Sequence, residues 1–210
     1  EDLEAIAKVL KDTNIMIASD EIYSELTYSG KHCSIAEIEG MRERTIVING
    51  FSKSFAMTGW RLGFLGGPKE IVSQMLKLHQ YAIMSSPTVS QYAAIVAMHS
   101  CQKDIDAMRN EYNIRRRFVV DSFNKLGLKC FAPQGAFYVF PCIKSTGMTS
   151  TDFCEKLVYT KKVAVVPGDA FGECGEGYVR VSYAYSLNHL REAIKRIGEF
   201  LEDIKNGNVQ

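Results

Sequence analysis

A lysine and an arginine, Lys53 and Arg61, stand eight residues apart in a stretch of the chain that is rich in small polar residues. The apolar run 46–48 before them predicts a buried strand, and Asn49-Gly50 predicts its end. In open α/β sheets ligands bind beyond the ends of strands, so Lys53 is placed to face a site. A lysine amine forms a Schiff base with an aldehyde, and a guanidinium binds phosphate through two parallel hydrogen bonds. The pair would suit a cofactor with an aldehyde and a phosphate, although such a pair alone is more often an exposed lysine and an arginine at a strand start.

An aspartate and a tyrosine three residues apart offer a second set of polar groups. Asp20 ends the strand predicted around 15–18, and a turn or a first helical coil after it would put the side chains of Asp20 and Tyr23 on one side. In isolation, an aspartate and a tyrosine at this spacing are more often a turn residue or helix cap and the edge of a core.

Two further side chains are suited to binding anions. Ser52 could donate a hydrogen bond to phosphate, although many serines that follow a strand bond their own backbone. Arg180 lies on the predicted strand 178–183, where its guanidinium could form a bidentate pair with a carboxylate. An arginine on the exposed face of a strand is the structural alternative.

The elements that must position these residues fall into two parts. Up to about residue 101, helical patterns alternate with short apolar runs, as in an α/β sheet with covering helices. A long helical pattern, 102–126, ends at Gly127 and is expected to cross between domains. The order that follows predicts a small α+β domain. Before the long helix, the expected elements are a helix around 3–10, strands 15–18, 46–48 and 62–66, and two helices, one from Pro68 and one after Pro87 through Gln91 to Met98. The helix from Pro68 carries Ile71, Met75 and Leu78 on one stripe. After the long helix, the expected elements are strands 137–140, 163–166 and 178–183, a helix starting at Thr151-Asp152, and a final helix 187–204.

The composition argues against several classes of function. The 210 residues carry a net charge of +1, so we expect no nucleic-acid partner. The triplet Arg115-Arg116-Arg117 is expected on the solvent-exposed face of a helix. No apolar run approaches the roughly 20 residues needed to span a bilayer, and the first residues lack a signal-peptide pattern, so we expect no membrane partner. Six cysteines without a C-x-x-C pair and four histidines without a metal-binding spacing predict a cytoplasmic protein with reduced thiols and no metal site.

The whole stretch around Lys53 is more specific than the lysine and arginine alone. Residues 52–63, SKSFAMTGWRLG, closely resemble the cofactor-lysine signature of class I aminotransferases, which are pyridoxal-phosphate enzymes of fold type I. Upstream, residues 19–23, SDEIY, resemble the segment whose aspartate meets the pyridine nitrogen and whose tyrosine meets the phenolic oxygen of the cofactor. Three motifs resemble those of the family's small domain: PQGAFY at 133–138, VPGDAFG at 166–172 and VRVSYA at 179–184. Together the motifs follow the order of the family and cover nearly the whole chain.

The resemblance implies a role for each candidate residue. Lys53 would be the catalytic residue, which forms a Schiff base with pyridoxal 5'-phosphate and later moves the substrate proton. Arg180 would bind the α-carboxylate of the substrate. The chain departs from some relatives at Gly50, where they carry a hydroxyl, so the phosphate would depend more on nearby side chains and on residues before Glu1. The implied cofactor-binding residues are Asp20, Tyr23, Ser52, Lys53 and Arg61.

The resemblance also implies a fold for the chain, the C-terminal part of a fold type I enzyme of the α/β class. Residues 1–101 would form an incomplete large-domain sheet that binds the cofactor, and residues 102–210 a small α+β domain, with the helix 102–126 linking the two. Because the chain starts abruptly at Glu1 and without Met, we expect a fragment that lacks roughly the N-terminal half. That fragment is expected to be inactive alone.

The implied function is the transfer of an amino group from an amino acid to a 2-oxo acid by a homodimer. Aminotransferase-like Cβ–S lyases and 1-aminocyclopropane-1-carboxylate synthases share the lysine, aspartate and arginine. The sequence Thr58-Gly59-Trp60 before Arg61, however, resembles that of the aminotransferases. A ligand-sensing domain of an aminotransferase-like transcription regulator is the alternative from another class. A helix-turn-helix module ahead of Glu1 would favour the regulator, whereas residues 20–23, DEIY, favour an enzyme.

Overall fold

The computed structural model describes residues 1–208 and groups them into two compact units, residues 1–109 and the described residues from 110 on. The boundary between the units falls inside helix α5, Gln102–Lys125. The long helix predicted at 102–126 is confirmed, and Gly127 follows it with φ of 82°, a backbone conformation that glycine adopts readily at a helix end. The predicted division after residue 101 lies at the first residue of this helix.

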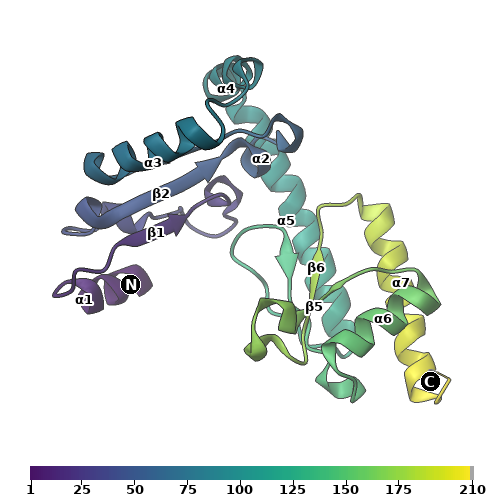
Figure 1. Ribbon diagram of the computed structural model, residues 1–210. Helices are drawn as coiled ribbons and strands as arrows, with labels where there is room; N and C mark the ends of the chain where they lie inside the picture. The colour runs from purple at the N-terminus through teal and green to yellow at the C-terminus, as the bar shows by residue number, and fades with distance from the viewer. Residues whose placement is uncertain (209–210) are drawn as a thin grey trace. The chain divides into compact units, whose positions relative to one another are not determined.

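The first unit is built on a three-stranded sheet with the order β1-β2-β3 (Figure 1). The strands are β1, Ile17–Asp20, β2, Thr45–Gly50, and β3, Gly63–Gly66. β1 and β2 are parallel, with Asp20 opposite Ile48, whereas β3 runs antiparallel to β2, with Gly63 opposite Gly50. The ends of β1 and β2 that carry the candidate residues therefore lie at the same edge of the sheet.

The first strand begins later than the sequence pattern predicted. Residues 15 and 16 precede β1, because the chain there follows a local turn: the Thr13 hydroxyl donates to Leu10 O at 2.9 Å and accepts from the Ile15 N–H at 3.3 Å. A backbone donor used in such a turn is not available to a strand ladder. The predicted end of the strand at Asp20 is confirmed.

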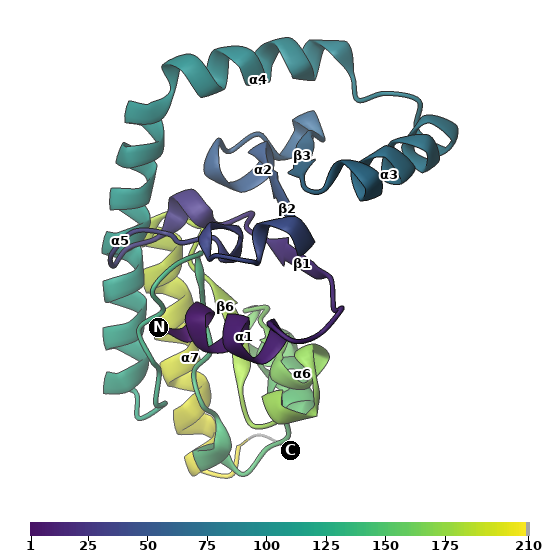
Figure 2. The ribbon, with the colours of Figure 1, turned by 90° about the vertical axis from the view of Figure 1, so that its left-hand side faces the viewer.

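Three longer helices accompany the sheet: α1, Asp2–Leu10, α3, Lys69–Ala82, and α4, Thr88–Ser100. Pro68 and Pro87 immediately precede α3 and α4, as predicted, and α4 leads into α5 through a sharp bend at Cys101 (Figure 2). The predicted stripe on α3 is not buried in this unit, since α3 has no buried residue and Leu78 is 73% exposed.

The second unit combines a small sheet with three helical segments. Its strands are β4, Tyr138–Val139, β5, Val166–Pro167, and β6, Val179–Ser182, in the antiparallel order β4-β6-β5; its helices are the later part of α5, α6, Ser150–Lys161, and α7, Leu187–Lys205. The core draws on each of these helices and on β6. Its fully buried side chains include Val119, Phe123, Phe153, Leu157, Val179, Tyr183 and Phe200.

Several sequence-based boundaries in this unit were wrong. The strand predicted at 137–140 is limited to β4, and β6 is one residue shorter at each end than the predicted 178–183. Residues 163–165 are not part of a strand, because pairing with β6 begins only where Val166 faces Arg180, and an apolar run forms a strand only where its backbone has a ladder partner. The helix predicted to start at Thr151 begins at Ser150, because Thr149 is the residue that caps it: its Oγ1 accepts from the Asp152 N–H at 3.1 Å.

The final helix predicted at 187–204 is confirmed, since α7 spans this range. Leu190, Ile197 and Leu201, which repeat along it, are buried, whereas Ile194 is half-buried. Among the described residues, no helix combines the length and the apolar character that a membrane span requires.

Candidate functional site

The turn after β1 and the loop after β2 are held side by side at one edge of the sheet in the first unit. The Glu21 N–H donates to Ile48 O at 2.8 Å, which extends the β1–β2 pairing one residue past β1. Asp20 is the last residue of β1, and Lys53 comes three residues after the last residue of β2. Ligand sites in open sheets lie beyond the carboxyl ends of parallel strands, which is where both segments are.

Lys53 and Arg61 lie on one closed loop between β2 and β3. Gly50 and Gly63 pair at its base, and the Phe51 N–H donates to Leu62 O at 3.2 Å. Lys53 belongs to the single-turn helix α2, Phe51–Ser54, and Arg61 directly follows the 3-10 turn η4, Thr58–Trp60, which packs against α2. The structure thus carries Ser52, Lys53 and Arg61 on the same loop.

Close approach of three segments explains the glycine at position 50. A Cβ on Gly50 would lie 3.1 Å from Ile22 Cδ1 and 3.2 Å from both Gly63 Cα and Leu62 O. A side chain here would require these neighbours to move.

The underside of the loop is packed and bonded to α4. Phe51 and Met57 are buried with Ala94 and Ala97 of α4, and the Ser90 hydroxyl of α4 donates to Trp60 O at 2.8 Å. These contacts hold both ends of the loop against a helix, so Lys53 stands on a rigid support rather than on a mobile loop.

Arg61 has a left-handed backbone, with φ of 49° and ψ of 49°, which costs a residue other than glycine about 1 kcal/mol. Its Nη1 donates to Thr58 O at 3.0 Å, which orients the exposed guanidinium toward its own loop. A guanidinium has five N–H donors in a planar fork, so one bond to a carbonyl is compatible with bidentate binding of a phosphate.

Asp20 and Tyr23 lie on one tight turn. Asp20 Oδ1 accepts from the Ile22 N–H at 3.2 Å, and the Ser24 N–H donates to Glu21 O at 2.9 Å. Tyr23 directly precedes the 3-10 helix η1, Ser24–Leu26. The structure bears out the local expectation that a turn follows Asp20; the roles of these two side chains stay predictions.

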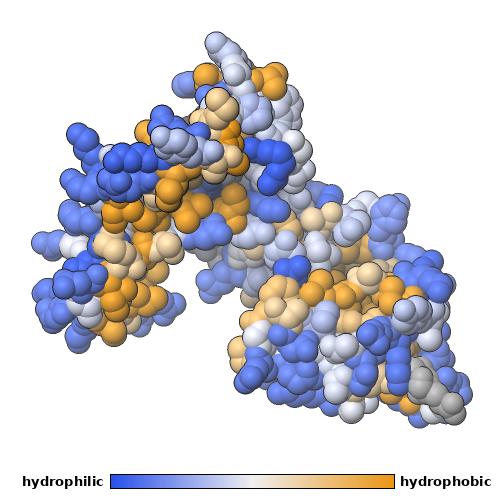
Figure 3. All heavy atoms as spheres, viewed as in Figure 1, coloured by the Kyte–Doolittle hydropathy of each residue, from blue (hydrophilic) through white to orange (hydrophobic). Residues whose placement is uncertain are grey.

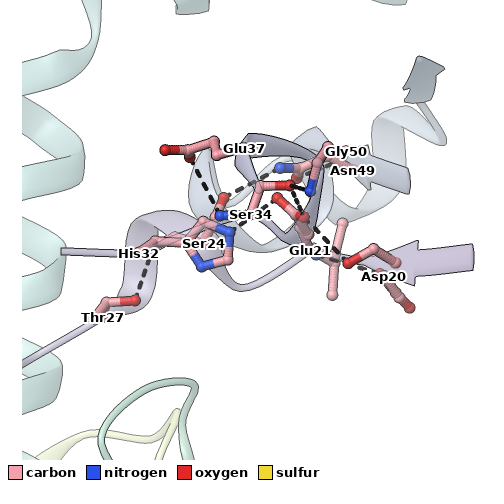
Figure 4. A network of polar contacts seen from close by, with 12 residues as sticks. Asp20, Glu21, Ser24, Thr27, His32, Ser34, Glu37, Asn49 and Gly50 are labelled. Atoms are coloured by element: carbon pink, nitrogen blue, oxygen red, sulfur yellow. Dashed lines mark hydrogen bonds and ion pairs between the residues drawn. The ribbon is translucent and has the colours of Figure 1, made fainter. Parts of the chain in front are cut away.

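A polar network behind this turn was missed by the reasoning from sequence. The Glu21 carboxylate, with only 9% of its side chain exposed, accepts from Ser34 Oγ at 2.5 Å and Ser19 Oγ at 3.1 Å and pairs with His32 Nε2 at 2.9 Å (Figure 4). Burial opposes ionisation, but the hydrogen bonds from Ser34, His32 and Ser19 outweigh it and hold the pKa of Glu21 below its ordinary value. A serine two residues before a glutamate at a strand end was the available signal, because the two side chains share a face of the strand.

Arg180 lies in the second unit, on β6, between two aromatic rings. Its guanidinium carbon is 4.5 Å from the ring centre of Tyr138 and 4.4 Å from that of Phe171. Phe171 ends the 3-10 helix η6, Gly168–Phe171, and its ring meets Phe140 edge to face at 5.7 Å. Stacking holds the planar guanidinium by its faces, so its N–H edge is suited to a planar carboxylate.

The structure thus brings Asp20, Tyr23, Ser52, Lys53 and Arg61 together in the first unit and places Arg180 in the second. In the first unit, the two cations on a closed loop and the carboxylate on the adjoining turn suit a phosphate-bearing aldehyde cofactor. In the second unit, taken by itself, the stacked arginine suits a carboxylate. Within the described residues, no group of three or more His, Cys, Asp and Glu side chains is arranged to hold a metal ion.

Comparisons with known proteins agree with this chemistry. The family model described as Aminotransferase class I and II matches residues 1–197. The putative aminotransferase YugH of Bacillus subtilis (strain 168) is 50% identical over 201 residues, which are 96% of this chain and 52% of YugH. The aspartate aminotransferase of Pyrococcus abyssi is 47% identical over 207 residues, which are 97% of this chain and 53% of that protein.

Solved structures give the same picture. The aromatic aminotransferase from Pyrococcus horikoshii OT3 superposes with a TM-score of 0.95 at 46% identity, over 97% of this chain and 55% of that one. MJ0684 from Methanococcus jannaschii, described as similar in its active site to kynurenine aminotransferases, gives a TM-score of 0.87 at 42% identity, over 94% and 53%. The predicted fold, the C-terminal part of a fold type I α/β enzyme, is confirmed, and the chain spans about half the length of the relatives it matches.

Proposed function

The chain belongs to the class I and II aminotransferase family, whose members depend on pyridoxal phosphate, and we propose that the full-length protein containing it moves an amino group from an amino acid to a 2-oxo acid. The observation that carries the proposal is the placement of Lys53 and Arg61 on one closed loop beside the Asp20–Tyr23 turn. The relatives named above are described as aminotransferases, which supports transamination over a lyase or a regulatory role.

The residues of the first unit fit pyridoxal phosphate. When bound, this cofactor supplies an aldehyde that condenses with amines and a protonated ring that accepts electron density. Arg61 and Ser52 would bind its phosphate, because both lie on the loop of Lys53. Lys53 would hold the aldehyde covalently and, once displaced by the substrate amine, would carry the proton between the substrate Cα and the cofactor.

Asp20 and Tyr23 would set the electronic state of the ring. An ionised Asp20 facing the ring nitrogen keeps that nitrogen protonated, and the bond from Ile22 N–H to Asp20 Oδ1 holds the carboxylate in one orientation. The Tyr23 hydroxyl would donate to the phenolic oxygen. Both side chains would reach the cofactor from the same turn, and the backbone bonds of that turn fix the spacing between them.

Arg180 would bind the α-carboxylate of the amino acid through two parallel hydrogen bonds. Tyr138 and Phe171 stack on its guanidinium and so limit its rotation before the substrate arrives. Fixing the carboxylate orients the Cα–H bond of the substrate for proton removal, which lowers the entropic cost of the reaction.

We further propose that the substrates are an amino acid and a 2-oxo acid, that the full-length protein is a homodimer, and that it works in the cytoplasm. The names of the relatives support the substrate class. All six cysteines are free thiols, which suits a reducing compartment. A screen of amino donors with the full-length protein would identify the amino acid.

The substitution Lys53→Ala in the full-length protein tests the proposal. The variant should lose the long-wavelength absorbance of bound pyridoxal phosphate together with all transaminase activity, because the covalent attachment and the proton carrier are the same amine. Lys69→Ala, which alters an exposed lysine at the start of α3, is the matched control and should change neither. Normal absorbance in Lys53→Ala, with loss on altering another lysine, would contradict the assignment.

A further inference from the structure

Asn49, the last but one residue of β2, links the two segments that carry the proposed cofactor-binding residues. Its Nδ2 donates to Ser24 Oγ at 3.1 Å, and its Oδ1 accepts from the Gly50 N–H at 2.7 Å (Figure 4). Because a backbone N–H can only donate, the amide oxygen must face Gly50 and the amide nitrogen must face Ser24. Ser24 directly follows Tyr23, and Gly50 opens the loop that carries Lys53.

Two other contacts join the same segments, so the amide belongs to a built junction. The Glu21 N–H donates to Ile48 O, and the Ile22 side chain closes over Gly50 so tightly that a Cβ there would lie 3.1 Å from Ile22 Cδ1. Gly50 itself is extended, with φ of −176° and ψ of 175°, and directly precedes α2. The backbone bond and the apolar contact hold the segments together, and the Asn49 amide adds a directional side-chain bond to each of them.

We propose that Asn49 is a positioning residue that fixes the Tyr23 turn against the Lys53 loop. The inference deepens the proposed function and rests on it. Tyr23 and Lys53 would engage two different substituents of one rigid aromatic ring, the phenolic oxygen and the aldehyde carbon. A rigid ring cannot adapt when one of its partners shifts, so the separation of the two segments determines whether both side chains reach it.

Three substitutions separate the bonds of this junction. Ser24→Ala removes the bond between the segments and leaves the Gly50 N–H paired, whereas Asn49→Ala removes both bonds. Ser24→Thr keeps a hydroxyl and is expected to restore the wild-type behaviour. Ser34→Ala is the matched control, because it deletes a hydroxyl that bonds the Glu21 side chain and leaves the Asn49 bonds to Ser24 and Gly50 in place.

The first measurement is steady-state kinetics of the full-length protein. Asn49→Ala should lower kcat roughly 10- to 100-fold, because displacement of a reacting group by about 1 Å has an effect of this size, while the KM for the amino acid stays within about threefold. Ser24→Ala should act in the same direction with a smaller loss. The pH at which the visible absorbance of the bound cofactor changes should shift in Ser24→Ala and Asn49→Ala and stay in place in Ser34→Ala and Ser24→Thr.

The second measurement is amide hydrogen exchange of the cofactor-free full-length protein, which needs no activity. Asn49→Ala should speed exchange at Gly50 and along the Lys53 loop, and Ser24→Ala should leave the Gly50 amide protected. Unchanged exchange in Asn49→Ala, or wild-type kcat and wild-type pH dependence of the absorbance in a folded Asn49→Ala or Ser24→Ala protein, would overturn the inference.

The two measurements separate this inference from the proposed function. If the wild-type protein binds pyridoxal phosphate without transaminating, the proposed function fails, and the exchange and absorbance results still decide the role of Asn49. If Asn49→Ala does not fold, Ser24→Ala decides it: a kcat and an absorbance profile equal to those of the wild type would overturn the role, and a shift in both would support it.

Discussion

The two compact units bury their apolar residues to very different extents. In the second unit the large side chains of α5, α6, α7 and β6 meet in one core, and Phe200, Leu157 and Tyr183 are fully buried. In the first unit, all four residues of β3 are exposed and α3 has no buried residue. Tyr81 on α3 is 94% exposed, and Figure 3 shows apolar side chains gathered over the elements of this unit.

This difference separates a self-sufficient unit from an incomplete one. A soluble protein seldom exposes a large continuous apolar surface unless another surface covers it. Both outer strands of the sheet, β1 and β3, also have an edge without a strand partner among the described residues. Because the chain spans about half the length of its relatives, we propose that other residues of the full-length protein, and the second subunit of the proposed homodimer, cover the first unit.

The largest effect is expected when the chain is studied without the residues that cover its first unit. The 210-residue chain alone should neither bind pyridoxal phosphate tightly nor transaminate, and its exposed faces should cause self-association. Cofactor titration, a transaminase assay and light scattering of this chain beside the full-length protein would check this. Micromolar cofactor affinity and turnover by the chain alone would show that the first unit needs no cover.

The next largest effect is expected on the stability of the second unit, when a residue of its core is replaced. Phe200 is fully buried and packs edge to face on Phe153 at 5.2 Å, so Phe200→Ala should destabilise this unit by about 3 to 5 kcal/mol. Tyr159→Ala, at a residue of α6 that is 75% exposed, should change stability by less than about 0.5 kcal/mol. Hydrogen exchange of the α6 and α7 amides in the full-length protein would measure both. Equal costs at the two sites would contradict the picture of a closed core.

The units should also differ in which step of function they affect. Arg180→Ala in the second unit should raise the KM for the amino acid and weaken transition-state binding by about 2 to 5 kcal/mol, as expected for one partner of a desolvated charged pair. Cofactor absorbance should be retained. Arg191→Ala on α7, also an arginine near an aromatic ring but exposed, is the matched control. Loss of the cofactor with unchanged substrate kinetics would contradict the assignment of Arg180 to the substrate carboxylate.

The smallest of these effects is the acid sensitivity of the first unit. Glu21 has a lowered pKa in the folded protein, so its bonds stabilise the fold above the ordinary pKa of 4.5, and this contribution disappears as the pH falls through the lowered value. Glu21→Gln should therefore cost about 2 kcal/mol near neutral pH, the scale of hydrogen bonds to a charged group, and the difference should shrink toward pH 3.

Glu192→Gln on α7 is the control for this experiment. Hydrogen bonding to Arg196 lowers the pKa of the Glu192 carboxyl too, but this side chain is 51% exposed, against 9% for Glu21, so its replacement should have a smaller effect. Urea unfolding of both variants between pH 3 and 7 would provide the comparison. A Glu21→Gln cost that stays constant or grows on acidification would contradict the network described for Glu21.

The fold was largely predictable from the sequence because its helices carry strong local signals. Pro68, Pro87 and Gly127 mark helix ends through backbone geometry that does not depend on distant contacts. The strands were less predictable, since residues 163–165 are apolar but have no ladder partner. Pairing is a long-range property that an apolar run does not specify.

The candidate site divides in the same way. The motif around Lys53 identified the loop, but its closure by Gly50 and Gly63 depends on the return of β3. The bonds of Glu21 to His32 and Ser34 and the bond of Asn49 to Ser24 were missed because these partners lie 11 to 25 residues away in the sequence. The aromatic rings around Arg180 likewise come from separate segments, so only the fold brings them together.

The central claim is that Lys53 is the lysine to which the cofactor is attached, and one measurement tests it most directly. The full-length protein loaded with pyridoxal phosphate would be treated with borohydride, which reduces a Schiff base to a stable amine, and then digested for mass spectrometry. We predict a phosphopyridoxyl group on the peptide that contains Lys53. The same group on a different lysine, or on none, would contradict the claim.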